Sequence, residues 1–353
     1  MKCVLSKTLL FIFIFNATIL FSQNINLHSF KKLSDIKQAK DTDDTDWYIG
    51  VDDPNEIVTI SGERHVSGNI VIANNGTLFL DNAQFNIDGE ITVLGQGKLT
   101  AQGGSFSIVQ DYAYQHELMV LENGNITFEN VDFSSSGHGW SVTLIGDSRY
   151  TMNQSEVQDG FITMALFEAS AASVTDSQMP GEFLCFGEND ISFSRCDFVL
   201  IWLVLPENSS IDVSLPGDSL LTNWRLSDSL TNVSGINYTV RIDSCTDVQW
   251  GIISNPHTNA TFSDTDFRVA GLMFTEPDSI VIGNITNESR HDDDRIQVPD
   301  RELRFVNSSV RTWNFYPTDN AILTVQNSVF GELLSMESAR AYVFNSVCDG
   351  SGG

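Results

Sequence analysis

Residues 76–85 read GTLFLDNAQF, and the pattern that ends this stretch recurs along the chain. Each copy has a short apolar run, a polar residue, two variable residues and a large apolar residue, as in NAQF at 82–85. A recurring period of this length is typical of a solenoid, in which each repeat buries its apolar side chains against its neighbours. Thirteen copies occur at intervals of 18 to 28 residues, at 82–85, 103–106, 130–133, 154–157, 176–179, 195–198, 223–226, 245–248, 264–267, 284–287, 307–310, 327–330 and 345–348.

The composition of each repeat is that of β-strands and turns. LMVL at 118–121 and NITF at 125–128 are two such runs, and ENG separates them. Val, Ile, Thr and Phe fill the runs, whereas the i, i+3, i+4, i+7 spacing of an amphipathic helix is missing. We therefore predict an all-β fold, a parallel β-helix of about 13 coils. At about 4.8 Å per coil, these coils would form a rod roughly 60 Å long.

Two positions of the repeat have a preferred residue. The polar position holds Asn in seven of the thirteen copies, and the large apolar position holds Phe in six. Equivalent residues of stacked coils lie above one another, so we expect Asn amides to hydrogen-bond along the stack and Phe rings to stack in the core. Packing alone explains both preferences, so neither position indicates a functional site.

The first 23 residues have the pattern of a secretory signal peptide. Lys2 and Lys7 precede an apolar run at 9–21, which is too short to span a bilayer. We expect cleavage before Asn24, a secreted, extracellular product and no membrane insertion. A periplasmic or cell-surface location is the alternative.

The rest of the chain divides into three parts. Residues 24–49 are expected to form a short N-terminal cap and an acidic linker, because Phe30, Leu33 and Ile36 have helical spacing. Residues 50–348 hold the β-helix, and 349–353 form a short flexible tail. No capping helix follows the last coil, so we expect a partner or self-association at that end, unless the sequence is a fragment.

The charge of the chain limits its partners. Removal of residues 1–23 leaves 17 Lys and Arg against 46 Asp and Glu, a net charge of −29. Such a chain repels nucleic acid and anionic membranes, so we expect neither as a partner. Polyanionic glycans would need a bridging cation.

Four cysteines remain after residue 23, and their places in the repeat argue against most disulfides. Only Cys185 and Cys196 lie in one coil, so only this pair meets the Cα distance limit of about 7 Å. The alternative is that Cys185, Cys196, Cys245 and Cys348 are small buried hydrophobic residues.

The signal peptide and the short stacked strands resemble those of the pectin-lyase-like superfamily of secreted β-helix proteins. The resemblance covers residues 50–348 and rests on periodicity and composition. It implies a right-handed parallel β-helix. Because the superfamily contains polysaccharide lyases, glycoside hydrolases, phage tailspikes and non-catalytic adhesins, the fold alone does not select a function.

One short motif of the family is present. Gly137-His138-Gly139 matches the Gly-His-Gly of polygalacturonase-type hydrolases and makes His138 a candidate catalytic residue. The acidic motifs that precede it in those enzymes are missing, since DDDRI at 292–296 comes far after it. The alternative is a histidine in a turn between coils.

The longest interruption of the late coils is 288–301, ESRHDDDRIQVPDR, which we predict to be a loop. It follows Asn287, a polar residue in the large apolar position of the repeat. Asp292, Asp293 and Asp294 are candidate ligands of Ca²⁺, and Asp292, Asp293 and Arg295 are candidate catalytic residues. The alternative is a solvated excursion in which opposite charges pair with one another.

Aromatic residues recur at strand starts, and most alternate with core residues. Trp202 follows Ile201 and lies one residue out of that alternation, so it is expected to face outward with Tyr112 and Tyr114 of an early loop. These three residues are the candidate sugar-binding platform.

For function we hold two hypotheses. The first is a non-catalytic extracellular adhesin or glycan-binding rod that binds extracellular or cell-surface polysaccharide, because no complete acid–base motif is found. The alternative is a polysaccharide lyase or glycoside hydrolase of the pectin-lyase-like type, so whether the chain is an enzyme stays open.

Overall fold

The computed structural model describes residues 46–205, 210–214, 229–232, 239–243, 246–255, 259–263, 266–275, 279–298, 301–335 and 338–349. Over these residues the chain is an all-β parallel solenoid of about 11 turns, without a helix. The predicted fold class is therefore confirmed, with fewer turns than the thirteen copies indicated. The expected signal peptide and residues 24–45 of the expected N-terminal cap and linker lie outside the described residues, as does most of the expected tail. The end of that segment, Trp47–Ile49, is strand β1 of the solenoid.

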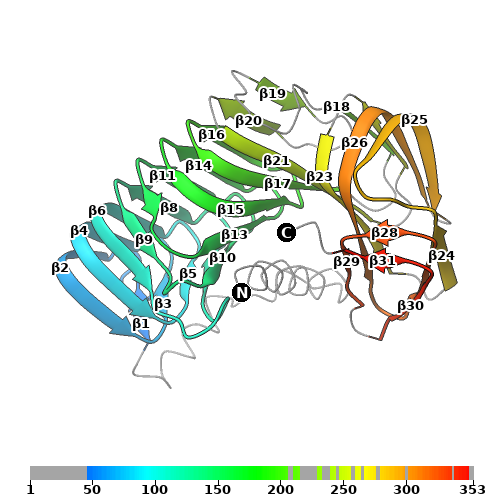
Figure 1. Ribbon diagram of the computed structural model, residues 1–353. Helices are drawn as coiled ribbons and strands as arrows, with labels where there is room; N and C mark the ends of the chain where they lie inside the picture. Colours follow the sequence, from blue (N-terminus) through cyan, green and yellow to red (C-terminus); the bar gives the residue numbers. More distant parts are fainter. Residues whose placement is uncertain are drawn as a thin grey trace.

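Three rows of parallel strands form the sides of the solenoid. We call the longest row the inner sheet, because Figure 1 shows several of its strands on the inner side of an arch into which the coils bend. Its strands pair in the order β1 (Trp47–Ile49), β3 (Ile70–Ile72), β5 (Ile91–Val93), β7 (Glu117–Val120), β10 (Gly139–Leu144), β13 (Phe161–Leu166), β15 (Gln178–Cys185), β17 (Asp197–Leu205), β21 (Thr246–Ser254), β23 (Asp266–Phe274), β26 (Arg301–Pro317) and β29 (Glu332–Leu333).

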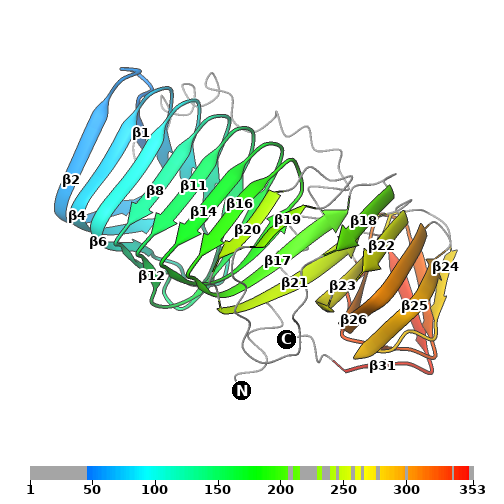
Figure 2. The ribbon, with the colours of Figure 1, turned by 90° about the horizontal axis from the view of Figure 1, so that it is seen from above.

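A second row, the outer sheet, covers another side, and its first seven strands lie side by side in Figure 2. They are β2 (Ile57–Ser67), β4 (Thr77–Asp88), β6 (Lys98–Ile108), β8 (Asn125–Glu129), β11 (Arg149–Asn153), β14 (Ala171–Thr175) and β16 (Asp190–Ser194). The row continues with β20 (Thr239–Asp243) beside β16, and β18 (Ser210–Ser214) and β22 (Asn259–Ser263) form a further parallel pair.

The remaining strands form the third side of the coils, a separate parallel sheet and two antiparallel pairs. Short strands on the third side are β9 (Asp132–Ser134), β12 (Glu156–Val157), β28 (Val329–Phe330) and β31 (Val347–Cys348), and β24 (Ser279–Gly283), β27 (Ile322–Gln326) and β30 (Arg340–Phe344) form a separate parallel sheet. The described strands that pair antiparallel are β19 (Ser229–Asn232) with β20, and β25 (Ser289–Val298) with β26.

The repeat pattern corresponds to one corner of each coil. Asn82 has a φ of 48°, in the left-handed region, and turns the chain between two apolar runs. Leu78 and Leu80 before it and Phe85 after it are all buried in the core. The polar position has left-handed φ in all ten copies whose polar residue is described, at Asn82, Gly103, Asn130, Gln154, Asp176, Arg195, Asn284, Asn307, Asn327 and Asn345.

This backbone conformation explains the preference for Asn better than the expected amide ladder does. Left-handed φ is costly for most side chains but is tolerated by Gly and Asn. One ladder contact of the expected kind is present, from Asn345 Nδ2 to Asn327 Oδ1 at 2.7 Å. The expected Phe stacking is present in the early coils, where the rings of Phe85 and Phe106 lie 5.5 Å apart.

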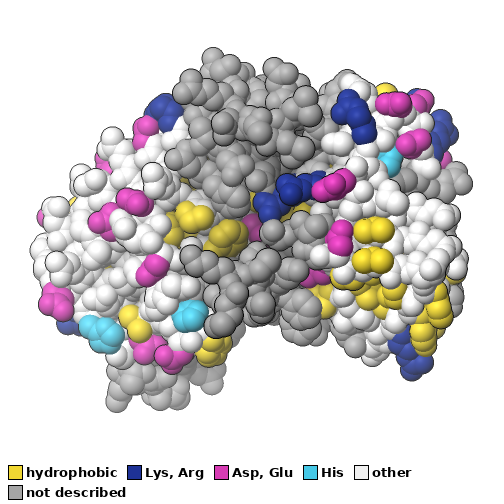
Figure 3. All heavy atoms as spheres, viewed as in Figure 1, with side chains coloured by type: hydrophobic (Ala, Val, Ile, Leu, Met, Phe, Trp, Pro, Cys, Tyr) yellow, Lys and Arg dark blue, Asp and Glu magenta, His cyan; other side chains and the backbone are white. Residues whose placement is uncertain are grey.

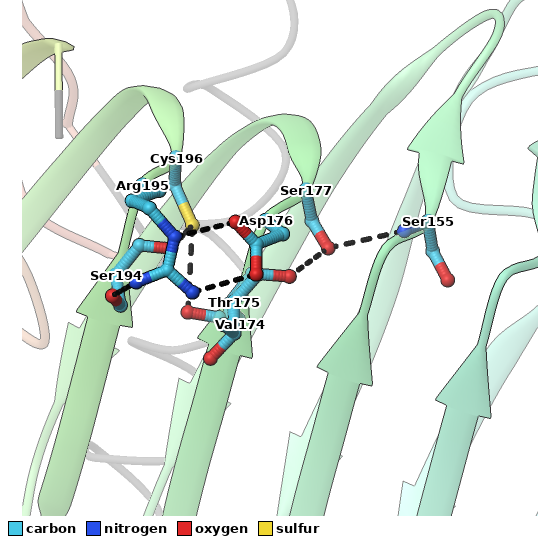
Figure 4. Close-up of polar contacts among 8 residues, drawn as sticks. All are labelled: Ser155, Val174, Thr175, Asp176, Ser177, Ser194, Arg195 and Cys196. Carbon is cyan, nitrogen blue, oxygen red and sulfur yellow. Dashed lines mark hydrogen bonds and ion pairs between the residues drawn. The ribbon is translucent and has the colours of Figure 1, made fainter.

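The next residue of each corner is often serine, a regularity that the sequence analysis missed. Ser177 Oγ accepts a hydrogen bond from the Ser155 amide of the preceding coil at 3.2 Å and donates one to the Thr175 carbonyl at 2.7 Å (Figure 4). Cys196 takes the same position one coil later and donates to the Val174 carbonyl. These side chains satisfy backbone groups where strand pairing breaks at the corner, as buried polar groups require.

The cysteines are reduced in the described part of the chain. Cys185 and Cys196 are buried and unbridged, which matches the small-hydrophobe interpretation and not the disulfide. Cys348 is exposed, so burial was wrongly predicted for it. Cys245 lies outside the described residues.

The stretch 288–301 was wrongly predicted as a loop. Residues Ser289–Val298 form β25, which pairs antiparallel with the first half of β26. The coil therefore stops after Asn287, whose Oδ1 accepts a hydrogen bond from the Trp313 amide at 3.0 Å. As a result β22 pairs with β26, and β24 pairs with β27.

No helix in the described residues is long and apolar enough to cross a membrane.

We predict that the left-handed corner is a strict requirement for stability. Replacing Asn130, which is exposed and has a φ of 53°, by Val should lower the free energy of unfolding by about 1–2 kcal/mol, because a β-branched residue is strained there. Asn130→Gly should be nearly neutral. Urea unfolding would measure both, with Asn153→Val in strand β11 as the control, and equal losses at 130 and 153 would contradict the prediction.

Candidate functional site

The structure places His138 in the turn between β9 and β10. Its amide donates to the Ser135 carbonyl at 3.0 Å, and its own carbonyl accepts from the Ser135 hydroxyl. The carboxylate of Asp159 accepts hydrogen bonds from the Ser134 hydroxyl and the Ser135 amide of the same turn. These contacts stabilise a turn and provide no acid–base partner for the imidazole.

The acidic run at 292–294 lies on strand β25, where successive side chains point to opposite sides. Asp293 forms a two-pronged ion pair with Arg304, at 2.7 and 2.9 Å, and this hydrogen-bonded pairing lowers its pKa. Asp294 contacts His291, and Arg295 contacts Glu302. The charges of the hairpin thus pair with one another, as the alternative interpretation stated.

The described residues contain no group of three His, Cys, Asp or Glu side chains that could hold a metal ion. The three consecutive Asp residues are divided between two sides of a strand, so they do not converge on one point. The Ca²⁺ site at Asp292, Asp293 and Asp294 therefore gains no support.

The three aromatic candidates fall into two environments. Tyr112 is 62% exposed on the loop between β6 and β7. Trp202 does point away from the solenoid interior, whereas Ile201 beside it lies in the core. Trp202 is nevertheless buried, in a second apolar cluster on the outward side of the inner sheet.

Tyr114 belongs to this second environment. Its hydroxyl lies 3.0 Å from the Thr163 hydroxyl of strand β13, and its amide donates to the Gly139 carbonyl. Thr163 is the strand neighbour of Glu182 on β15. The loop after β6 thus brings Tyr114 to the same side of the inner sheet as Trp202 and Glu182.

Glu182 is a carboxyl group on the same side of the inner sheet as these aromatics, and its pKa is raised. Burial raises its pKa from 4.5 to about 7; Arg268 acts against this shift and Glu332 adds to it. Among the described residues, Trp202 Nε1 makes no hydrogen bond of regular geometry. The indole therefore lies near Glu182 without donating a hydrogen bond to it. Glu182 therefore holds or releases a proton near neutral pH.

Glu332 forms the other half of the cluster. Its Oε2 accepts hydrogen bonds from Tyr316 Oη and from Asn314 Nδ2, both at 3.3 Å, and its pKa is raised by burial. The influence of Glu332 on the pKa of Glu182 shows that the two carboxyls lie near each other, although four strands of the inner sheet separate β15 from β29. The bend of the arch in Figure 1 is consistent with this approach.

Two glycines of the inner sheet make room for the rings. A Cβ atom at Gly251 would lie 2.5 Å from the Trp202 indole, and one at Gly271 would lie 2.8 Å from the Tyr316 ring. Each aromatic side chain therefore lies against the backbone of a neighbouring strand. We call Tyr114, Glu182, Trp202, Arg268, Tyr316 and Glu332 the inner-face cluster.

The outer sheet has a surface of a different kind. In one column of equivalent, outward-facing residues on successive strands, every residue but one is Thr or Ser. These residues are half-exposed, except for Thr59 at the start of the column, which is exposed. The Ser192 hydroxyl donates a hydrogen bond to the Ser173 hydroxyl of the adjacent coil at 3.0 Å. We call this the hydroxyl column: Thr59, Phe79, Thr100, Thr127, Thr151, Ser173 and Ser192.

The charge of the described surface is distributed and not concentrated. Figure 3 shows Asp and Glu side chains spread over the described surface, with Lys and Arg placed among them. The face it shows therefore has no single acidic or basic block in its described part.

Sequence reasoning placed Tyr114 and Trp202 together but missed Glu182 and Glu332. A signal existed, since each follows a glycine and interrupts an otherwise apolar stretch, in PGEFLCF at 180–186 and FGELL at 330–334. A lone carboxyl in a buried strand costs free energy unless it is paired or protonated. The hydroxyl column was also missed, because Thr and Ser are common in strands.

We predict that Glu182 makes the protein less stable as the pH rises. Its folded pKa is raised, so its stabilising effect is complete below pH 4.5 and is lost as the pH rises toward about 7. The loss should be about 3 kcal/mol for Glu182 alone. Glu117 and Glu332 are shifted in the same direction and add to the total.

Urea unfolding of the wild type and of Glu182→Gln at pH 5 and pH 8 isolates this contribution. The neutral amide does not titrate, so the variant should lose less stability between the two pH values. Equal losses in both proteins would contradict the raised pKa.

Comparison of the chain with protein-family models, with curated proteins and with solved structures finds no match. The strand pairing shows that the chain is a parallel β-solenoid.

Proposed function

We propose that this chain is a secreted rod that binds extracellular or cell-surface polysaccharide along its outer sheet, and that it is a non-catalytic adhesin. The hydroxyl column is the observation that carries the proposal. A linear polymer presents the same groups at regular intervals, and the column offers hydroxyls coil after coil at about 4.8 Å.

The chemistry of the column fits a sugar ligand. Hydroxyls both donate and accept hydrogen bonds, so they match the hydroxyls of a glycan. Phe79 interrupts the column with a half-exposed ring between Thr59 and Thr100, and an aromatic face packs against the apolar face of a sugar ring. The column is also accessible, whereas Trp202 is only 1% exposed.

The net charge favours a neutral ligand. Without residues 1–23 the chain carries −29, and such a field repels polyanionic glycans. Neutral polysaccharides such as glucans or chitin are therefore the expected class.

Removal of hydroxyls tests this proposal. In pull-down with insoluble cellulose and chitin, we expect residues 24–353 to bind and Thr100→Val/Thr127→Val/Thr151→Val to bind at least tenfold more weakly. Val keeps the β-branched shape of Thr and removes only the hydroxyl. The matched control is Ser107→Ala/Ser134→Ala, which removes half-exposed hydroxyls from the neighbouring side of the same coils. Equal binding by the triple variant and the wild type would overturn the proposal.

A second candidate function, glycoside hydrolysis, is favoured by the inner-face cluster. Hydrolases of glycans use two carboxyl groups, one of them protonated at the working pH. Glu182, with a pKa of about 7, suits the general acid, and Glu332 suits the second carboxyl group. We rank this function second because Glu182 is only 8% exposed.

Product release separates the two functions. Incubation of residues 24–353 with the same neutral glycans should release no reducing ends if the chain only binds. Release that disappears in Glu182→Gln and Glu332→Gln, and persists in Asp293→Asn on the distant hairpin, would establish the hydrolase instead.

A further inference from the structure

Two exposed aromatic residues lie close together on strand β30. Tyr342 is 46% exposed and Phe344 is 57% exposed. As alternate residues of one strand they point to the same side, about 6.6 Å apart along the strand. In Figure 3 hydrophobic side chains gather at the end of the molecule where Figure 1 places β30. Two rings are therefore presented together to solvent, and an exposed apolar patch of this kind marks a binding surface.

The rings are on the outward side of the coil and not on its open end. Tyr342 pairs with Thr324 on β27. Thr324 lies between Leu323 and Val325, which are both buried in the core, so Thr324 and its neighbour Tyr342 point away from the core. Phe344, two residues further along β30, points the same way. A further coil stacked on β30 would extend this surface and would leave both rings facing solvent.

Tyr342 occupies the repeat position of the hydroxyl column. It lies three residues before the corner residue Asn345, as Thr100 lies three residues before the corner residue Gly103. Thr324, on the strand that pairs with β30, has the same position and is half-exposed like the hydroxyls of the column. The column position therefore resumes beyond the β25–β26 hairpin, and in the last described coil a ring takes the place of the hydroxyl.

The surroundings of the rings are polar but almost uncharged. Each ring has a neutral hydrogen-bonding neighbour on β27, with Thr324 beside Tyr342 and the exposed Gln326 beside Phe344. Within β24, β27 and β30 only Arg340 is charged, although the whole chain is strongly acidic. Such a surface suits a neutral ligand that has an apolar face and hydroxyl groups at its edge.

We propose that Tyr342 and Phe344 form an aromatic subsite that stacks on the sugar rings of a neutral, β-linked polysaccharide. The inference rests on the proposed glycan binding and adds the class of sugar and a second place of contact. In β-linked glucose and N-acetylglucosamine units the substituents lie at the edge of the ring, so the apolar face is free to pack on an aromatic ring. The hydroxyls at that edge can bind the side chains of Thr324 and Gln326.

Replacement of the rings tests the subsite. Affinity electrophoresis of residues 24–353 in gels that contain soluble hydroxyethylcellulose or glycol chitin measures Kd. Tyr342→Ser/Phe344→Ser should bind about tenfold more weakly than the wild type. Phe344→Leu keeps the apolar bulk without the ring and should also bind more weakly, whereas Tyr342→Phe keeps the ring and should bind like the wild type.

Val281→Ser is the matched control. Val281 pairs with Thr324 from the other side, on β24, and is 51% exposed on the same outward face, but it has no ring. The control should bind like the wild type. Circular dichroism checks that the variants fold, and Tyr342→Leu/Phe344→Leu replaces the serine pair if that pair does not.

The column variant Thr100→Val/Thr127→Val/Thr151→Val separates this inference from the proposed function. If it binds like the wild type while the ring variants lose affinity, the column fails and the subsite stands. If it loses affinity while Tyr342→Ser/Phe344→Ser binds like the wild type, the subsite is overturned and the column stands. Binding by Phe344→Leu equal to that of the wild type, or a loss in Val281→Ser as large as in the ring variants, would show a general apolar contact and would also overturn the subsite.

Discussion

One corner residue per coil, with left-handed φ, is the constraint on which the rest of the structure depends. It turns the strand after a fixed number of apolar residues, so that side chains before and after the corner both reach the core. Because the next coil turns at the same place, its strands stay in register with the strands of the coil below. Regular columns on the outside, such as the hydroxyl column, are consequences of that register.

The solenoid could be predicted from sequence because every coil repeats the same local requirements. Alternating apolar residues and the polar corner are visible in each copy without knowledge of distant contacts. The number of turns could not be read in the same way. The copy at 284–287 ends in Asn287 and leads into the β25–β26 hairpin, and the hairpin is held by contacts such as Asp293 with Arg304 that no repeat pattern specifies.

The candidate site was only partly predictable for a related reason. The position of Trp202, one residue out of the core alternation, indicated its outward direction, and Tyr114 lies on the same side of the inner sheet, but Trp202 is buried there. The carboxyls were missed because their proximity depends on how the whole rod bends. Glu182 and Glu332 are 150 residues apart and belong to strands that are not neighbours in the sheet. Position within one repeat does not contain that information.

Around the β25–β26 hairpin, β22 pairs with β26 and β24 pairs with β27. This pairing affects the order in which the strands can find their partners during synthesis. From β1 to β16 each new coil finds a finished coil to stack on as it leaves the ribosome, so the solenoid can grow from its N-terminal side. Strand β24 is different, because its partner β27 begins only at Ile322. Residues 279–321 must therefore be synthesised before β24 can pair with β27, its partner among the described strands, and during that interval the edge of β24 that β27 covers is left for chaperones or neighbouring nascent chains to meet.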